Sequence, residues 1–340
     1  MPLTIDLSLK SMELNSILSP IAEDLKLFDQ RLKENLNSDS TLISKVATHL
    51  VNRKGKRLRP AMVFLSHGGC SNSGSNSASN PQVMNVALAI EFIHTATLLH
   101  DDVIDQSKVR RGQVSVNHKW NNLVSVLMGD FLLAKSLRLI VATESPSLLS
   151  TISKATENLS IGEVNEAQES HNFDLDERTY LQIISEKTAS LFTASCESGA
   201  VAAGATEAVR QSMKEYGQNL GMAFQITDDL LDWVGESEKT GKGLGNDLKE
   251  GKITLPLIHT LRECEDQTRT EILRLLENDF NQKDFDDILS RIKGNGGVRY
   301  AREKARAFGE KAFGYLSELA DSEYSKALRD LVGFVIERDI

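Results

Sequence analysis

The chain has 340 residues, of which 40% are hydrophobic and 26% charged, and its formal net charge is −9 at pH 7. A chain of this size can bury a large core, and its acidic balance argues against a protein that coats nucleic acid. The three cysteines are odd in number and far apart, which favours a reduced, cytoplasmic setting. The N-terminus lacks the pattern of a signal peptide, and no uninterrupted apolar run approaches membrane-spanning length, so we expect a soluble protein.

Apolar residues recur at helical spacing along nearly the whole chain. The runs LSPIAEDLKLFDQRL (18–32), NVALAIEFIHTATLL (85–99) and LVSVLMGDFLLAKSLRLI (123–140) place apolar side chains three or four residues apart. Alternating, strand-like runs are scarce. The sequence therefore predicts an all-α protein, a single helical bundle formed by residues 1–340.

Two stretches interrupt the helical pattern. Residues 66–82, SHGGCSNSGSNSASNPQ, are rich in Gly, Ser and Asn and predict a flexible surface loop. Residues 235–252, GESEKTGKGLGNDLKEGK, mix glycines with charges, a composition typical of a mobile loop over a site. An ordinary solvated connection between helices has the same composition, so the second stretch alone identifies no site.

An acidic motif, D-D-x-x-D, lies near residue 100. On a helix, His94, Asp101 and Asp105 fall on one stripe. Two carboxylates one turn apart repel each other unless a cation lies between them, and a Mg²⁺ ion bridging to phosphate oxygens is suited to that place. Arg110 and Arg111 follow at once, and arginine forks match phosphate oxygens. The motif indicates a site for metal and diphosphate, although a solvated acidic helix end remains the alternative.

The same motif occurs again in GMAFQITDDLLDW (221–233). Asp228 and Asp232 are one helical turn apart and Gln225 lies on nearly the same stripe, so a second pair of carboxylates can face the first across a bundle. Basic residues complete the set: Arg53, Lys54, Lys56, Arg57, Arg59, Lys187, Lys242 and Lys252. A basic run alone would indicate solvated surface or a nucleic-acid patch, but beside two acidic motifs it indicates diphosphate binding.

Six segments together resemble the trans-isoprenyl diphosphate synthases, the head-to-tail polyprenyl synthetase family. They are GKRLRP, IHTATLLHDDVIDQSKVRRG, GDFLLAK, EKTASLF, GMAFQITDDLLD and GNDLKEGKITLPL, and they span the chain from about Arg53 to Lys252. The resemblance implies one large all-helical fold in which the two aspartate motifs face each other across a deep central cavity. It also implies a homodimer.

The resemblance further implies roles for single residues. The metal ligands, for three Mg²⁺ ions per active site, would be Asp101, Asp102, Asp105, Asp228 and Asp232. Isopentenyl diphosphate would be bound by Lys56, Arg59, His94 and Arg111. The allylic diphosphate would contact Arg110, Lys187, Thr188, Gln225, Lys242 and Lys252. Catalysis would rest on Asp101, Asp105, Lys187, Gln225, Asp228 and Asp232.

The resemblance also bears on the product. Short-chain members carry bulky aromatic side chains near Ala96 and Thr97, whereas both side chains are small here. We expect an open tunnel floor and a long all-trans polyprenyl diphosphate of the octaprenyl type, built on farnesyl or geranylgeranyl diphosphate for a quinone side chain. Small residues at these positions could instead serve only helix packing. Such an oily product would leave through transient contact with a membrane.

Three other functions stay open: a short-chain farnesyl or geranylgeranyl diphosphate synthase, a class I terpene cyclase, and a non-catalytic subunit of a heteromeric synthase. Cyclases usually replace the second aspartate motif with an Asn/Ser/Glu triad and lack GKRLRP, and silent subunits tend to lose aspartates. One position departs from the family pattern. The segment GEVNE (162–166) places Glu166 where the family commonly has glutamine.

Overall fold

The structure, a computed structural model, describes residues 13–51, 55–71, 80–110, 112–235, 244–276 and 281–337. Its first half comprises α1 (Leu14–Ile17), η1 (Ser19–Ile21), α2 (Ala22–Leu36), α3 (Thr41–Val51), α4 (Leu58–Cys70), α5 (Pro81–Ile104), β1 (Val109–Arg110), β2 (Gln113–Val114), α6 (Val116–Lys119), α7 (Asn122–Val141) and α8 (Pro146–Gln168). Its second half comprises α9 (Glu177–Ile184), η3 (Ser185–Ala189), α10 (Ser190–Ala202), α11 (Glu207–Val234), α13 (Asn246–Lys249), α14 (Leu255–Glu263), α15 (Asp266–Leu276), α16 (Gln282–Gly294), α17 (Gly297–Tyr315), η4 (Leu316–Glu318) and α18 (Glu323–Ile336).

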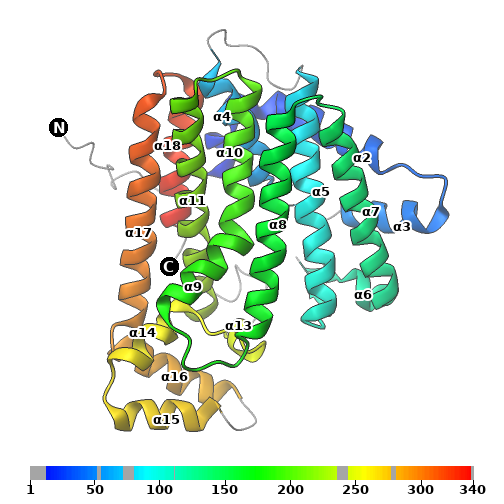
Figure 1. Ribbon diagram of the computed structural model, residues 1–340. Helices are drawn as coiled ribbons and strands as arrows, with labels where there is room; N and C mark the ends of the chain where they lie inside the picture. The colour runs from blue at the N-terminus through cyan, green and yellow to red at the C-terminus, as the bar shows by residue number, and fades with distance from the viewer. Residues whose placement is uncertain are drawn as a thin grey trace.

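The predicted all-α class is confirmed. Within the described ranges the two short strands, β1 and β2, pair only with each other in an antiparallel hairpin. The long helices α5, α7, α8, α10, α11 and α17 run side by side, and α14, α15 and α16 gather at one end of them (Figure 1). The C-terminal ends of α5, α8 and α11 all point to that same end.

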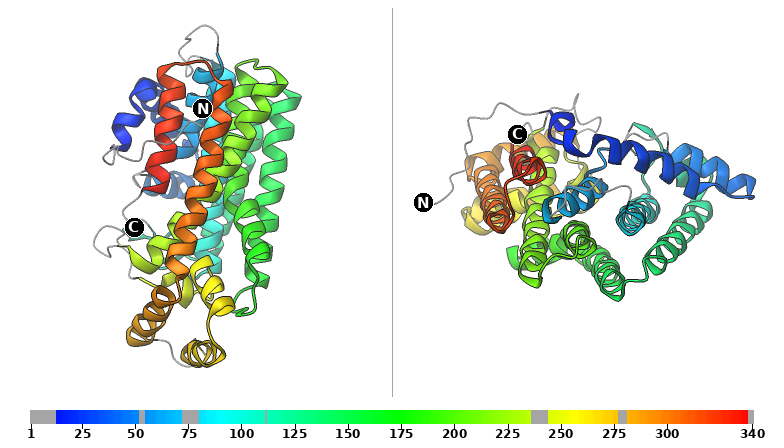
Figure 2. Two further views of the ribbon diagram at one scale, coloured as in Figure 1. Left: turned by 90° about the vertical axis from the view of Figure 1, so that its left-hand side faces the viewer. Right: turned by 90° about the horizontal axis from the view of Figure 1, so that it is seen from above.

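Helix α5 forms the centre of the bundle. The Asn80 side chain caps its N-terminus by accepting a hydrogen bond from the backbone N–H of Gln82, and Pro81 occupies the first turn. It packs against α2, α4, α7, α8 and α10, and the view from above shows it between α2 and the α7–α8 pair (Figure 2). By length and composition α5 could span a membrane, contrary to our expectation, but 67% of its most apolar window is buried by other helices. A helix that is apolar on all sides is what the centre of a bundle requires.

Buried side chains form two hydrophobic clusters. The larger cluster fills the space between α2, α4, α5, α7, α8, α10 and α18, and the smaller lies between α9, α11, α14, α15, α16 and α17. Helix α11 contributes to both, through Leu220 and Ala223 on one side and Met222 and Ile226 on the other. This continuity through α11 accords with one domain over residues 1–340, which stays a prediction.

Both predicted loops are shorter than the composition suggested. Helix α4 continues to Cys70, and α5 begins at Pro81. The glycines near the end of α4 serve close packing, because a Cβ on Gly68 would lie 2.5 Å from the ring of Tyr324 in α18. In the second stretch α13 occupies Asn246–Lys249. Residues 72–79 and 236–243 lie outside the described residues.

Candidate active site

The first aspartate motif lies at the C-terminal end of α5. The β1–β2 hairpin follows it in the chain and contacts it through Arg110. The fully buried Asp102 forms an ion pair with Arg110 of β1, with 2.7 Å between Asp102 Oδ1 and Arg110 Nε. Burial would lower the pKa of Arg110, but the carboxylates of Asp102, Asp101 and Asp105 together raise it by more. Asp102 Oδ2 receives no hydrogen bond from the described residues. The sequence assigned Asp102 to Mg²⁺ and Arg110 to the allylic diphosphate. In the structure the two side chains pair with each other.

Lys187 is held by two carboxylates of α8. Its Nζ lies 2.8 Å from Glu163 Oε2 and 2.5 Å from Glu166 Oε2. Burial would lower the pKa of Lys187, but Glu166 and Glu163 overcome burial and raise it. Burial raises the pKa of Glu163 to about 7, although Lys187 opposes that change. All three side chains are between 20% and 27% exposed, so the cluster is only partly screened by water.

A π-helical turn and a glycine bring Lys187 to α8. Residues Ser185–Ala189 form a π-helix, η3, between α9 and α10. Such wide turns are rare and are frequent at functional sites. Gly162 of α8 faces this turn, and a Cβ there would lie 2.4 Å from the backbone N of Lys187. Only a glycine allows α8 to pass this close, which brings the adjacent Glu163, and Glu166 one turn further along α8, to the Lys187 ammonium.

The neighbour of Lys187 faces α11 instead. Thr188 Oγ1 donates to Gln225 Oε1 at 2.7 Å, and Gln225 Nε2 donates to Asp229 Oδ1 at 2.7 Å. The Tyr180 hydroxyl donates to the other Asp229 oxygen at 2.5 Å. Burial raises the pKa of Asp229 to about 7, although both hydrogen bonds oppose it. Asp229, the second aspartate of the second motif, is thus a buried, hydrogen-bonded group that orients Gln225.

The second motif is capped by the turn that follows α11. The two carboxylate oxygens of Asp232 accept hydrogen bonds from the backbone N–H groups of Asn246 and Asp247, each at 3.1 Å. Gly245, with φ +73°, begins α13 in the left-handed region that favours glycine. Burial, and then the charge of Asp232, raise the pKa of Asp247 well above its usual range. This turn brings further acidic groups to the end of α11.

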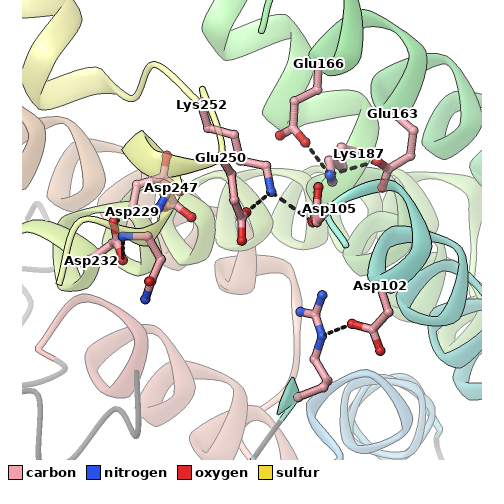
Figure 3. A network of polar contacts seen from close by, with 12 residues as sticks. Asp102, Asp105, Glu163, Glu166, Lys187, Asp229, Asp232, Asp247, Glu250 and Lys252 are labelled. Carbon is pink, nitrogen blue, oxygen red and sulfur yellow. Dashed lines mark hydrogen bonds and ion pairs between the residues drawn. The ribbon is translucent and has the colours of Figure 1, made fainter. Parts of the chain in front are cut away.

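Lys252 connects the two motifs. Its backbone N–H donates to the carbonyl of Asp247 at 2.8 Å, and its Nζ lies 3.2 Å from Asp105 Oδ2 and 2.7 Å from Glu250 Oε2. Burial would lower the pKa of Lys252, but Glu166, Asp105 and Glu250 together raise it by more. Figure 3 shows these groups in one polar network, to which α5, α8, α11 and the turn after α11 all contribute. The two aspartate motifs therefore belong to one site.

Asp101 shares this electrostatic environment. Burial raises its pKa, while the positive charges of Lys187 and Arg110 lower it by less than burial raises it. Asp105 adds to the rise by repulsion. The carboxylates of the site therefore repel one another, and a bound cation would relieve this repulsion.

A second group of cationic side chains lies where α4 meets α5 and α10. Arg59 Nη1 is 3.2 Å from His94 Nε2, and its guanidinium carbon is 5.0 Å from the Phe192 ring centroid. Lys56 Nζ is 5.6 Å from the ring centroid of Phe334 in α18. The structure thus brings Arg59 and His94 into contact, as a shared role in isopentenyl diphosphate binding requires, and turns Lys56 toward the C-terminal helix.

Arg57 belongs to the basic set noted in the sequence but was assigned no ligand, and it determines the backbone of the GKRLRP segment. Its φ of 50° lies in the left-handed region, and it immediately precedes α4. Its guanidinium pairs with the buried Glu91 of α5 and, at 3.2 Å, with Asp29. These bonds hold a backbone conformation that non-glycine residues rarely adopt, and so fix where α4 begins.

The two residues predicted to set product length differ in exposure. Ala96 is completely buried within the larger cluster, whereas Thr97 is partly exposed and its hydroxyl donates to the carbonyl of His94 at 3.0 Å. Only Thr97 therefore offers surface to a bound chain. Ala96 is enclosed by packed helices, as the helix-packing alternative for small residues describes.

Three predicted site residues remain to be placed. Asp228 is exposed on α11 beside the network. Arg111 and Lys242 lie outside the described residues.

Sequence reasoning missed several groups that complete the site: Glu163, Glu166, Tyr180, Asp229, Asp247 and Glu250. GEVNE was noticed only as a departure from the family pattern. Asp229 lies inside the second motif, and Asp247 and Glu250 lie in the predicted loop. No sequence signal pointed to Tyr180, because its contact with Asp229 joins residues 49 positions apart.

The donor set fits Mg²⁺. All candidate ligands are carboxylate oxygens, the hard ligands that Mg²⁺ prefers. Among the described residues no three acidic, histidine or cysteine side chains converge closely enough to hold an ion by themselves. Mg²⁺ commonly takes only one or two carboxylates and completes its shell with water and substrate phosphates, so a pair such as Asp101 and Asp105 is sufficient on the protein side.

Comparison with known proteins gives the same family for sequence and fold. Residues 40–292 match the family model described as polyprenyl synthetase. The chain is 35% identical over 328 residues to the octaprenyl diphosphate synthase of Haemophilus influenzae, covering 96% of this chain and 98% of that protein. It is 36% identical to the all-trans-nonaprenyl-diphosphate synthase (geranyl-diphosphate specific) of Rhodobacter capsulatus, covering 95% and 97%.

A solved structure is similar over nearly the whole chain. The polyprenyl synthase of Caulobacter crescentus, crystallised with calcium and isoprenyl diphosphate, superposes with a TM-score of 0.90 at 34% identity, covering 97% of this chain and 99% of that one. That complex contains a divalent cation and a diphosphate.

Proposed function

Because the chain belongs to the polyprenyl synthetase family, we propose that it is a prenyltransferase that condenses isopentenyl diphosphate with an allylic diphosphate to give a long all-trans polyprenyl diphosphate. One observation carries the proposal at the level of chemistry. The Lys252 ammonium pairs with Asp105 of the first motif, and the backbone of the turn that carries Lys252 is hydrogen-bonded through Asp247 to Asp232 of the second, so acids and a lysine from both motifs gather at one place. Such a network suits a diphosphate bound through divalent cations and ammonium groups.

The first step of the proposed reaction breaks the allylic C–O bond. The bonding pair leaves with the diphosphate, and an allylic carbocation remains. Lys187, Lys252 and Arg110 would stabilise the negative charge that builds on the departing oxygens, since cations in a partly buried site act strongly on developing charge. Thr188 and Gln225 hold each other at 2.7 Å and would orient the diphosphate.

The second step joins the two substrates. The double bond of isopentenyl diphosphate attacks the carbocation, and the resulting cation then loses a proton to give a new allylic diphosphate. The departing diphosphate would accept that proton, because no side chain stands out as a base. We assign the isopentenyl diphosphate to Arg59, His94, Lys56 and Arg111, of which Arg59 and His94 are in contact at 3.2 Å. The surrounding apolar side chains would keep water from the cation.

Magnesium would supply charge neutralisation of the diphosphate and Lewis-acid activation of the leaving group. We assign it to Asp101, Asp102, Asp105, Asp228 and Asp232, with three ions per active site. Asp102 and Asp105, which pair with Arg110 and Lys252 in the structure, would share their oxygens between these cations and the metal.

The product is assigned as a long chain from the named relatives, which are octaprenyl and nonaprenyl diphosphate synthases. The partly exposed Thr97 supports that assignment, since no bulky side chain stands at this position. Farnesyl or geranylgeranyl diphosphate is the proposed primer. We place the enzyme in the cytoplasm, with transient membrane contact when the oily product leaves.

A homodimer is also part of the proposal. Helix α7 exposes Leu123, Leu127, Leu137 and Val141, each between 57% and 66% exposed, along one face. We call these four residues the α7 apolar face. Helical spacing aligns them, together with the exposed Asp130 between Leu127 and Leu137, and exposed apolar side chains gathered on one face mark a protein interface. A second copy of the chain is the proposed partner.

The proposal is tested by incubating the purified protein alone with Mg²⁺, isopentenyl diphosphate and farnesyl diphosphate, and by identifying the extracted product by mass. We expect a linear prenyl product longer than geranylgeranyl. The Asp105→Asn variant, which keeps the size of the side chain, should lose at least about a hundredfold in rate, because one substituted charge-stabilising group typically costs that much. A cyclic hydrocarbon would identify a cyclase, a short product a short-chain synthase, and absent turnover by folded protein a silent subunit.

A further inference from the structure

The Lys187 ammonium is already paired with two carboxylates. An ammonium group has three N–H donors, and two of these are directed to Glu163 and Glu166 at 2.8 and 2.5 Å. The charges facing Lys187 from other elements are Asp101 of α5 and Lys252 after α13. An allylic diphosphate that binds Lys187 must therefore compete with two carboxylates for the same ammonium group.

The second of these carboxylates, Glu166, carries a charge that a glutamine at the same position would lack. Glu166 stands where the resembling family commonly has glutamine, which could accept the same hydrogen bond without a charge. The hydrogen bond from the Lys187 ammonium is charge-assisted with either residue, but only the carboxylate adds the attraction between opposite charges in a partly buried place. Glu166 makes the shorter of the two contacts and is 27% exposed, so solvent screens its charge only in part.

We propose that Glu166 is a built-in competitor of the allylic diphosphate: its carboxylate holds the Lys187 ammonium against α8 and thereby weakens binding of the allylic substrate. Glu166 acts through Lys187 and is not itself a catalytic residue. The inference rests on the proposed function, because it takes Lys187 as a ligand of the allylic diphosphate. It assigns to Glu166 a specific effect on one of the two substrates.

The test compares the wild-type protein with Glu166→Gln. Binding of farnesyl thiolodiphosphate, an unreactive allylic analogue, is measured by calorimetry in the presence of Mg²⁺. We expect Glu166→Gln to bind it about three- to tenfold more tightly, which corresponds to roughly 0.7–1.4 kcal/mol at 1.4 kcal/mol per tenfold. The KM for farnesyl diphosphate should fall by a similar factor while the KM for isopentenyl diphosphate stays unchanged. The difference should shrink as ionic strength rises.

Two variants control for charge and position. Glu166→Asp keeps the charge and should bind the analogue within about twofold of wild type. Glu186→Gln removes a charge next to Lys187 in sequence, but Glu186 accepts hydrogen bonds from the amides of Asn165 and Gln182. It should leave the affinity unchanged.

Each outcome decides between explanations. Unchanged or weaker binding by a folded Glu166→Gln protein overturns the inference, as does an equal gain in Glu186→Gln. If wild-type protein turns over its substrates, such a result leaves the proposed function intact. If wild-type protein neither binds the analogue nor turns over, the proposed function fails and the inference fails with it.

Discussion

At the scale of single residues, the site is defined by acidic groups kept away from water. Burial raises the pKa values of Glu163 and Asp229 to about 7 and raises that of Asp247 well above its usual range. Each of these groups binds a proton more tightly in the folded protein than in the unfolded chain. Stability contributed by such protonation is fully present below the unfolded pKa and is lost as pH rises through the folded pKa.

The contribution of Glu163 to the pH dependence of stability can be measured. In the absence of Mg²⁺ and substrates, the free energy of unfolding should fall as pH rises from about 5 to 8, because Glu163 must ionise in a buried place over that window. The Glu163→Gln variant should show a smaller fall, since the amide does not titrate. Urea unfolding at several pH values measures both slopes. Equal slopes would remove Glu163 from the explanation.

Thr97 carries the prediction for product length. Thr97→Phe should shorten the prenyl product by one or more isoprene units, because an aromatic ring would block the partly exposed surface at this position. Thr97→Val, of nearly equal shape, should leave the length unchanged. Ala96→Phe should instead lower stability by about 1–3 kcal/mol, since Ala96 is fully enclosed. Mass analysis of extracted products and urea unfolding check these outcomes, and an unaltered product from Thr97→Phe would contradict the first.

At the scale of elements, the long helices could be predicted from the periodicity of their apolar residues. Elements whose shape depends on contacts with distant parts of the chain could not. Apolar spacing located α2, α5 and α7, and the two aspartate motifs were expected on facing helices. The π-helical turn η3 has no periodic signal, because its wide turn depends on α8 passing at Gly162. The β1–β2 hairpin was also not foreseen, since two strands of two residues each leave no alternating pattern.

The close approach at Gly162 can be tested directly. Gly162→Ala should destabilise the protein by about 1–3 kcal/mol, because its Cβ would lie 2.4 Å from the backbone of Lys187 and force η3 away from α8. It should also weaken binding of the allylic analogue, because Lys187 would move. Urea unfolding and calorimetry measure these effects.

Gly314→Ala is the matched control for Gly162→Ala. Gly314 lies in α17 with nothing within 4 Å of an added Cβ. An alanine there should stabilise the helix by about 0.5–1 kcal/mol, since it reduces the conformational freedom lost on folding. A gain of stability in both variants would show that helix propensity, and not the contact with η3, decides the result.

At the scale of the whole molecule, the position of the site follows from how the helices are arranged. The ends of α5, α8 and α11 meet at one end of the bundle, so polar residues near the C-termini of three long helices gather there (Figure 1). The fold class and the pairing of the motifs could be predicted, because motif residues carry their own chemistry. Tyr180 and Glu163 could not, since their importance comes only from which residue the fold sets beside them.

The α7 apolar face leads to a prediction about assembly. Leu127→Asp should convert the expected dimer to a monomer and weaken association by at least about a hundredfold, because both copies would bury an unpaired charge. Tyr315→Asp changes an exposed residue of α17, on the far side of the bundle from α7, and should leave the dimer intact (Figure 1). Light scattering after size-exclusion chromatography reports the mass, and a wild-type monomer would refute the assignment.

The π-helical turn also constrains how this chain can change over time. A π-turn contains one residue more than an α-helical turn, so a single deletion within Ser185–Ala189 would restore regular hydrogen bonding. That deletion would rotate all of α10 by about 100° about its axis and carry Leu191 and Phe192 out of the core. Because a deletion in this turn would displace the buried side chains of α10, the extra residue is retained. Relatives of this protein should therefore show substitutions in the turn far more often than deletions.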